Sequence, residues 1–190
     1  MDALKPDYIL LSHGHSDHVA DVERIYGNSQ ATVVSNFEIT AWFENRGVKN
    51  IHPMNTGGKW NFDFGMVKMT PALHSSSMPD GSYGGNPAGF VIESEGKTFY
   101  YAGDTALSVE MKLIGEKHKL DFAFLPIGDN FTMGIEDALE AAGYLGIDRF
   151  IPMHFDTFPY IKVDHSYAKE LAANKKKELL LLKIGEKISL

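Results

Sequence analysis

The hexapeptide HGHSDH at residues 13–18 decides how the rest of this sequence is interpreted. It directly follows the apolar run 7–11 (DYILL), which predicts a buried strand that ends in a loop. At this composition, a sequence of this length would contain the pattern H-x-H-x-D-H by chance in roughly one case in a thousand, so the pattern is specific. A loop lets its three imidazoles and its carboxylate point to a common centre, and the strand behind holds the loop rigid. We therefore expect metal ligands at His13, His15, Asp17 and His18.

Four ligands within six residues are too crowded to satisfy one ion, so a site with two metals needs further ligands from distant parts of the chain. Three candidates each follow a predicted strand, where the active-site residues of layered α/β proteins collect. They are His74, Asp104 and His154.

Strands and helices alternate at both ends of the chain, and the middle has the period-two pattern of antiparallel strands. The patterns predict strands at 7–11, 31–35, 58–73 with a turn at Gly65, 88–94, 98–102, 122–126, 150–153 and 179–182. They predict helices at 18–26 with Asp17 as its cap and Gly27 at its end, 36–45 with Asn36 as its cap, 107–118, 136–145 and 166–176. This mixed order favours an α/β sandwich over a purely parallel sheet.

Length and composition predict a single globular domain over residues 1–190, because 44% of the residues are hydrophobic and 23% are charged. The net charge of −7 gives no general attraction to nucleic acid. With no cysteine, any metal site must use imidazole and carboxylate ligands. No apolar run suits a membrane span or a secretion signal, so we expect a soluble cytoplasmic protein.

The motifs HGHSDH, ALHSS, AGDT and PMHF, in this order, resemble those of the metallo-β-lactamase superfamily. The sequence is most similar to its branch of uncharacterised metal-dependent hydrolases that are similar to ascorbate-phosphate lactonase, through DTALSVEMKLIGE, LPIGDNFTMGIEDA and PMHFDTFPYI. The resemblance implies an αβ/βα sandwich with a binuclear metal centre. By this resemblance, one metal would be held by His13, His15 and His74, the other by Asp17, His18 and His154, with Asp104 bridging the two.

The sequence departs from that family in two ways. Members usually begin with additional strands of the first sheet, so the domain is expected to be short at its N-terminus and to expose a strand edge. This chain would then be a fragment or be covered by another subunit, and we expect a homo-oligomer. The second departure is Asp156, which stands where the family pattern has Asn. An extra carboxylate near the metals would alter the preference for substrate charge.

Two divalent metal ions would lower the pKa of a bridging water, and the resulting hydroxide would attack an ester, lactone or phosphoester bond of a small molecule. Zn²⁺ is the first choice of metal, with Mn²⁺, Fe²⁺ and Ni²⁺ as alternatives. Asp17 and Asp104 are the expected catalytic carboxylates, since Asp17 could orient the hydroxide through its free oxygen. The side chains expected to reach the substrate are those of Ser75, Asp129, Asn130 and Asp156.

Three other functions remain open at this point. A di-iron site would support oxygen or redox chemistry, although that chemistry usually has a carboxylate where His15 stands. A non-catalytic metal-binding or regulatory module would have the same ligands without turnover. A nuclease would share the hydrolytic chemistry, but the acidic balance of the chain argues against it.

Overall fold

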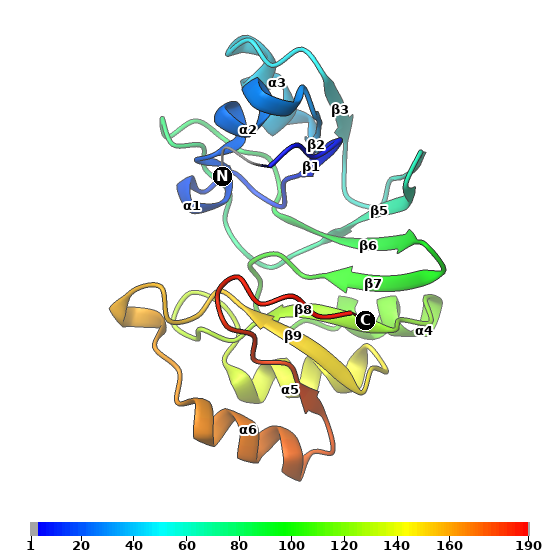
Figure 1. Ribbon diagram of the computed structural model, residues 1–190, viewed down its shortest axis with the longest axis vertical. Helices are drawn as coiled ribbons and strands as arrows, with labels where there is room; N and C mark the ends of the chain where they lie inside the picture. Colours follow the sequence, from blue (N-terminus) through cyan, green and yellow to red (C-terminus); the bar gives the residue numbers. More distant parts are fainter. Residues whose placement is uncertain (1–3, 190) are drawn as a thin grey trace.

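The computed structural model describes residues 4–189, which form four layers (Figure 1). A three-stranded sheet faces a seven-stranded sheet, and helices cover the outer side of each. This arrangement is an αβ/βα sandwich, so the predicted fold class is confirmed. No helix among the described residues is long and apolar enough to cross a membrane.

The first sheet is parallel, in the order β1-β2-β3, and its outer side is covered by three helices. Its strands are β1 (Tyr8–Leu10), β2 (Thr32–Asn36) and β3 (Ile51–Met54), and its helices are α1 (Ser16–Val19), α2 (Val22–Ser29) and α3 (Phe37–Asn45). Helix α3 begins as the sequence predicts, because the side chain of Asn36 accepts a hydrogen bond of 2.9 Å from the Ile39 amide. Its buried Phe43 packs into a small core with Val33 of the sheet.

The predicted helix 18–26 is wrong, because the chain breaks it into α1 and α2. Asp17 therefore lies inside α1, and Gly27 lies inside α2 and does not end it. The apolar period does not reveal the break, since Val19 before it and Val22 after it are buried in the same core. The short strand β3 has no alternating pattern and contains a proline, and the sequence patterns did not predict it.

The second sheet has the order β10-β9-β8-β7-β6-β5-β4, antiparallel from β4 to β7 and parallel from β7 to β10. Its strands are β4 (Lys59–Phe62), β5 (Gly65–Pro71), β6 (Ala88–Ser94), β7 (Lys97–Tyr101), β8 (Phe122–Pro126), β9 (Arg149–Met153) and β10 (Glu178–Leu179). The helices are α4 (Glu110–Lys117), α5 (Ile135–Tyr144), α6 (His165–Asn174) and the 3₁₀ turn η1 (Pro159–Ile161). The last strand is shorter than the predicted 179–182.

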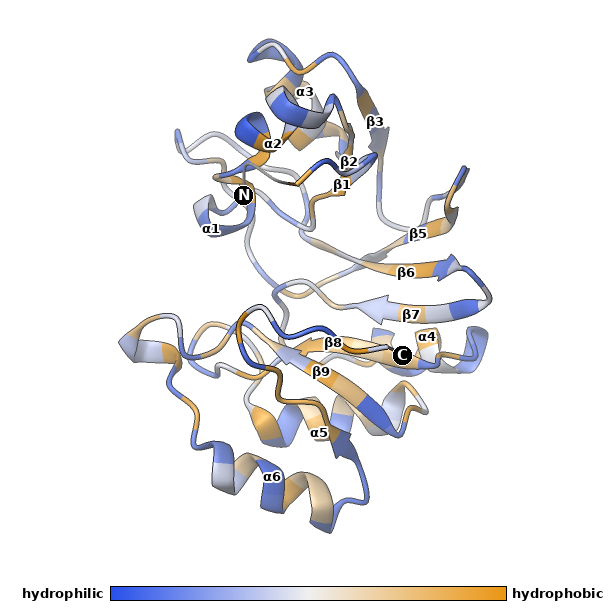
Figure 2. Ribbon diagram, viewed as in Figure 1, coloured by the Kyte–Doolittle hydropathy of each residue, from blue (hydrophilic) through white to orange (hydrophobic). Residues whose placement is uncertain are grey.

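Side chains of both sheets meet between them. Val67, Met69 and Phe90 of the second sheet are buried there and pack with Leu10 and Met54 of the first sheet. A larger core lies on the other side of the second sheet, beneath α4, α5 and α6. Figure 2 shows hydrophobic residues along β6, β8 and β9, and both hydrophobic and hydrophilic residues on α5 and α6. The segments that follow β1, β5, β7 and β9 carry the seven predicted ligands.

Candidate metal centre

The segment after β1 holds its four candidate ligands in two different conformations. His13 and His15 lie in the loop, whereas Asp17 and His18 lie on the single turn of α1. His13 is fully buried, and the hydroxyl of Ser12 lies 3.0 Å from its Nδ1 atom. This contact leaves Nε2 of His13 free to face the other ligands, a role of Ser12 that the sequence analysis missed.

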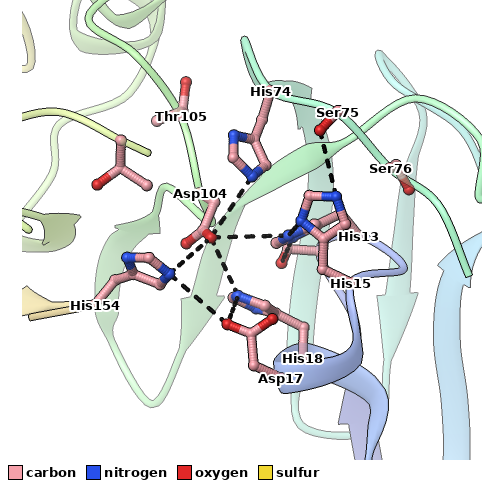
Figure 3. A network of polar contacts seen from close by, with 12 residues as sticks. His13, His15, Asp17, His18, His74, Ser75, Ser76, Asp104, Thr105 and His154 are labelled. Carbon is pink, nitrogen blue, oxygen red and sulfur yellow. Dashed lines mark hydrogen bonds and ion pairs between the residues drawn. The ribbon is translucent and has the colours of Figure 1, made fainter. Parts of the chain in front are cut away.

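Asp104, in the loop after β7, lies at the centre of the cluster and is buried. Four imidazoles surround one of its carboxylate oxygens, Oδ2, as Figure 3 shows. Their Nε2 atoms lie 3.1 Å (His154), 3.2 Å (His18), 3.7 Å (His74) and 3.8 Å (His13) away. Asp104 is therefore the residue at which the loops of both sheets converge.

The seven predicted ligands form two groups, in each of which the ligand atoms lie within 4.8 Å of one another. The first group is His13, His15 and His74, and the second is Asp17, His18, Asp104 and His154. The structure thus brings together residues that are far apart in the sequence, in the grouping that the family resemblance implies, with Asp104 in the second group. Their roles as metal ligands stay predictions.

Burial sets the charge of several of these groups. It lowers the pKa of His13 to about 3, with the nearby His18 acting in the same direction. Burial also lowers the pKa of His74. Burial opposes ionisation of Asp104, but the hydrogen bond and charge of His18 outweigh it, and the pKa of Asp104 is lowered. Neutral imidazole and ionised carboxylate are the forms that coordinate cations, so these three groups are prepared for a metal.

Two further observations show that the residues fit divalent cations. The Oδ1 atom of Asp104 is buried and has no hydrogen-bond partner among the described residues. A buried carboxylate oxygen without a partner is costly, and a cation would satisfy it. Burial alone would lower the pKa of His18, but the hydrogen bond and charge of Asp104 outweigh it and raise that pKa. The raised pKa shows that the charge of Asp104 favours positive charge at this position, which a cation would also supply.

Neighbouring residues hold the ligand loops together. The Thr105 hydroxyl accepts a hydrogen bond of 3.0 Å from the Leu73 amide, and the Thr105 carbonyl accepts one of 3.0 Å from the Met133 amide. Thr105 thus connects the Asp104 loop with the residue before His74 and with the loop after β8. The motif AGDT contains this threonine, but only the fold shows what it contacts.

His154 stands in a loop of unusual backbone geometry. Seven non-glycine residues of the described chain have positive φ, and four of them follow β8 or β9 beside the metal centre. These four are Asp129, Asn130, His154 and Asp156. Left-handed backbone costs free energy for such residues and is concentrated at functional sites. The second-sheet loops are therefore shaped at a cost to stability.

A cavity of about 290 Å³ opens onto the metal centre. It is lined by His15, Asp17, His74, Ser75, Asp104, Phe131, His154 and Phe158. A larger hollow of about 540 Å³ lies near the C-terminal ends of α4 and α5, and no predicted ligand lines it. The smaller cavity is therefore the candidate substrate site.

Of the four residues expected to reach the substrate, only Ser75 lines this cavity, and its Oγ atom lies 3.3 Å from Nε2 of His15. Asp129 and Asn130 form a left-handed turn, after which Phe131 lines the cavity. The Oδ2 atom of Asp156 lies 2.6 Å from Nε2 of His165, and its Oδ1 atom accepts a hydrogen bond from the Val163 amide, so this carboxylate contacts its own loop and does not line the cavity. Phe131 and Phe158 were not predicted from the sequence, because an aromatic residue in a loop carries no signal of its own.

The model of the β-lactamase superfamily domain matches residues 2–155, which include all seven candidate ligands. The chain belongs to this superfamily. Within the superfamily it is 57% identical to a UPF0173 metal-dependent hydrolase of Christiangramia forsetii, over 98% of this chain and 82% of that protein. It is 55% identical to one of Flavobacterium johnsoniae, over 100% of this chain and 84% of that protein. The resemblance seen in the motifs is thereby confirmed.

A solved structure is also similar to this chain. Igni18 of Ignicoccus hospitalis, described as a novel metallo hydrolase, superimposes with a TM-score of 0.88 at 34% sequence identity. The match covers 99% of this chain and 81% of that one. The four-layer architecture is therefore that of a known metallo hydrolase.

Proposed function

We propose that this protein is a metal-dependent hydrolase that cleaves an ester, lactone or phosphoester bond of a small molecule. The observation that carries the proposal is the convergence of four imidazole Nε2 atoms on Oδ2 of Asp104 beside an open cavity. The relatives named metal-dependent hydrolases support the same conclusion.

The two ligand groups would hold two divalent cations. His13, His15 and His74 would bind one, Asp17, His18 and His154 the other, and Asp104 would contact both. Zn²⁺ suits this set of nitrogen and oxygen donors, and Mn²⁺, Fe²⁺ and Ni²⁺ are the alternatives to be tested. When bound, such cations activate water at neutral pH and polarise a carbonyl or phosphoryl oxygen.

The residues of the chain would orient the reactants and move the proton. The Asp17 side chain is exposed and lines the cavity, while its Oδ2 atom lies 3.4 Å from His18 and 3.7 Å from His154. Its carboxylate can accept the proton that water loses on attack and return it to the leaving oxygen as the scissile bond breaks. Ser75 at the cavity wall can donate a hydrogen bond to the substrate.

A metal-reconstitution experiment tests this function. The chelated protein would be reloaded separately with Zn²⁺, Mn²⁺, Fe²⁺ or Ni²⁺, and its metal content would be measured. Each form would then be assayed with uncharged esters, lactones and phosphoesters. We expect turnover only in metal-loaded forms with two equivalents bound. Two bound metals without turnover on this panel would support a non-catalytic module, oxygen-dependent turnover of the iron form would support redox chemistry, and cleavage of nucleic acid alone would support a nuclease.

We also propose that the protein forms a homo-oligomer. In the described part of the chain, β1 is an edge strand that pairs only with β2. An uncovered strand edge can pair with another copy of the chain. A monomeric mass by light scattering at micromolar concentration would contradict the proposal. The cytoplasmic location and the single-domain organisation stay predictions.

A further inference from the structure

The cavity beside the metal centre has a polar side and an aromatic side. The aromatic side is formed by Phe131 and Phe158, which remain 50% and 38% exposed. Their ring centroids lie 5.9 Å apart at an interplanar angle of 40°. The exposed ring of Tyr160 packs against Phe131 in a T-shaped arrangement, with the ring centroids 6.4 Å apart. We call these three rings the aromatic wall.

The backbone holds Phe131 in place from both sides. Asp129 and Asn130 before it are left-handed, and the Asp129 carbonyl accepts hydrogen bonds from the amides of Phe131 and Thr132. The Asp129 amide donates a hydrogen bond to the carbonyl of the buried Met133. The Met133 amide in turn donates to the carbonyl of Thr105, which is next to Asp104. The first ring of the wall is therefore joined to the metal centre through a short chain of hydrogen bonds.

Phe158 is fixed by the loop that also carries His154. The Ile161 amide donates to the Phe158 carbonyl at 3.2 Å, and the Ile161 side chain is fully buried. The Asp156 amide donates to the Ile161 carbonyl at 2.8 Å, which closes the loop. Two exposed rings on fixed backbone lose little entropy when a ligand binds, as in a preorganised binding site.

The charges around the cavity restrict what the wall can bind. No lysine or arginine is among the residues that line the cavity in the described chain. An anionic group on the substrate would therefore find no cation at the wall. A flat apolar group would cover the exposed rings and gain stacking or edge-to-face contacts.

We propose that the aromatic wall binds an uncharged aromatic ring next to the scissile bond, so that the preferred substrates are arylalkyl esters or aryl-substituted lactones. This inference rests on the proposed hydrolytic function and makes Phe131 and Phe158 determinants of specificity. The metal centre receives the reacting group, while the wall selects the group attached to it.

A matched pair of substrates tests the proposal. Benzyl acetate and cyclohexylmethyl acetate release primary alcohols of similar acidity, so their comparison isolates the ring. We expect kcat/KM to favour benzyl acetate by about 2- to 10-fold for each ring engaged, from the usual strength of aromatic contacts. Phe131→Leu and Phe158→Leu keep an apolar side chain but remove the ring, and should raise KM for benzyl acetate with little change in kcat or metal content.

Phe37→Leu provides the matched control. Phe37 is exposed on α3 and does not line the cavity, so this substitution should leave both substrates unaffected. Equal kcat/KM for the two esters in the parent protein would overturn the wall proposal and leave the hydrolase proposal standing. A change of oligomeric mass in Phe131→Leu and Phe158→Leu without a change in KM would also overturn it, because the rings would then be a contact between copies.

A binding measurement separates this proposal from the function on which it rests. N-benzylacetamide, an amide analogue of benzyl acetate, would be added to the metal-loaded protein and its ring protons followed by saturation-transfer NMR. We expect transfer in the parent protein and a clear loss in both leucine variants. Such a result without hydrolysis of any ester would retain the wall and reject the hydrolase, whereas no transfer in the parent protein would reject the wall.

Discussion

The two sheets contribute to the metal centre in different ways. The first sheet supplies four candidate ligands from one segment of six residues, whereas the second supplies His74, Asp104 and His154 from three separate loops. The first set is local in the sequence, and the second exists only when β5, β7 and β9 are in register. The groups cut across this division, since His74 lies with His13 and His15, and His18 lies with Asp104 and His154. Each group of candidate ligands therefore draws on both sheets.

Asp104→Asn is the most severe test of this division, because Asp104 contacts imidazoles from both sheets. The amide keeps the shape but removes the negative charge that would offset two dications. We expect kcat to fall by more than about 100-fold, the upper end of the effect of removing a group that only supports a ligand. At least one metal should bind more weakly.

Kinetics with a verified substrate, together with elemental analysis, would measure both effects. Asp137→Asn, at an exposed position on α5, is the matched control and should retain parent values. Parent turnover with two metals in Asp104→Asn would require the bridging role to be abandoned.

Paired ligand substitutions test whether each metal is held by residues that are close in space or by residues that are close in the sequence. His15→Ala and His74→Ala remove ligands from the same group, although one comes from each sheet, so each should lose one metal equivalent. The double variant should still lose only one. His154→Ala combined with His74→Ala affects both groups and should lose two.

Metal counting by elemental analysis distinguishes these results, and turnover should fall by about 100-fold or more in each single variant. If His15→Ala combined with His74→Ala lost both metals and each single variant lost one, the grouping would be wrong.

The local ligands explain how much of the site the sequence could reveal. HGHSDH is dense enough to be recognised alone. The capping of α3 by Asn36 and the strand 122–126 could also be predicted, because each depends only on residues that are neighbours in the sequence. The aromatic wall could not be predicted, because it depends on two loops meeting. Asp129 and Asn130 looked like substrate contacts, but a side chain added at Gly134 would lie 3.4 Å from the Asp129 carboxyl carbon. Asp129 therefore sits beside the N-terminus of α5, a favourable place for a carboxylate.

We call the three-stranded sheet with its helices and loops the first region, and the seven-stranded sheet with its helices and loops the second region. Each region has a glycine in a loop that packs closely against a neighbouring segment. A Cβ at Gly128, in the second region, would overlap the His154 carbonyl and approach a Cβ of Ile161 to 2.9 Å. A Cβ at Gly14, in the first region, would meet the Sδ atom of Met78 at 2.6 Å, and a methionine side chain can move. Gly128→Ala should destabilise the protein by about 1–3 kcal/mol, the usual cost of overpacking, and Gly14→Ala by less.

Urea unfolding of the metal-free variants would measure these free energies without the contribution of bound metal. The ring preference of Gly128→Ala should also weaken, because its loop carries Phe131. Equal losses of unfolding free energy in the two variants would mean that the loops of the second region are not packed more rigidly than those of the first.

The smallest expected effect concerns a loop of the second sheet that is fastened to the first region. The loop 75–87 joins β5 to β6, yet Trp42 of α3 donates a hydrogen bond of 2.8 Å to Asp80 within it. Hydrogen bonds lower the pKa of Asp80 from 3.8 to about 2, and the bond from the Ser82 hydroxyl contributes more than the bond from the Trp42 indole. A carboxyl whose pKa is lowered by folding adds stability above its unfolded pKa, and that stability is lost as pH falls through the folded pKa.

Asp80→Asn should therefore lower the thermal midpoint of the metal-free protein slightly at pH 6, and the difference should narrow as pH falls from 3.8 towards 2. Ser166→Ala, at an exposed position on α6, is the control for the measurement. A difference that stayed constant over this range would show that the charge of Asp80 does not fasten the loop, and that the two regions are joined there by packing alone.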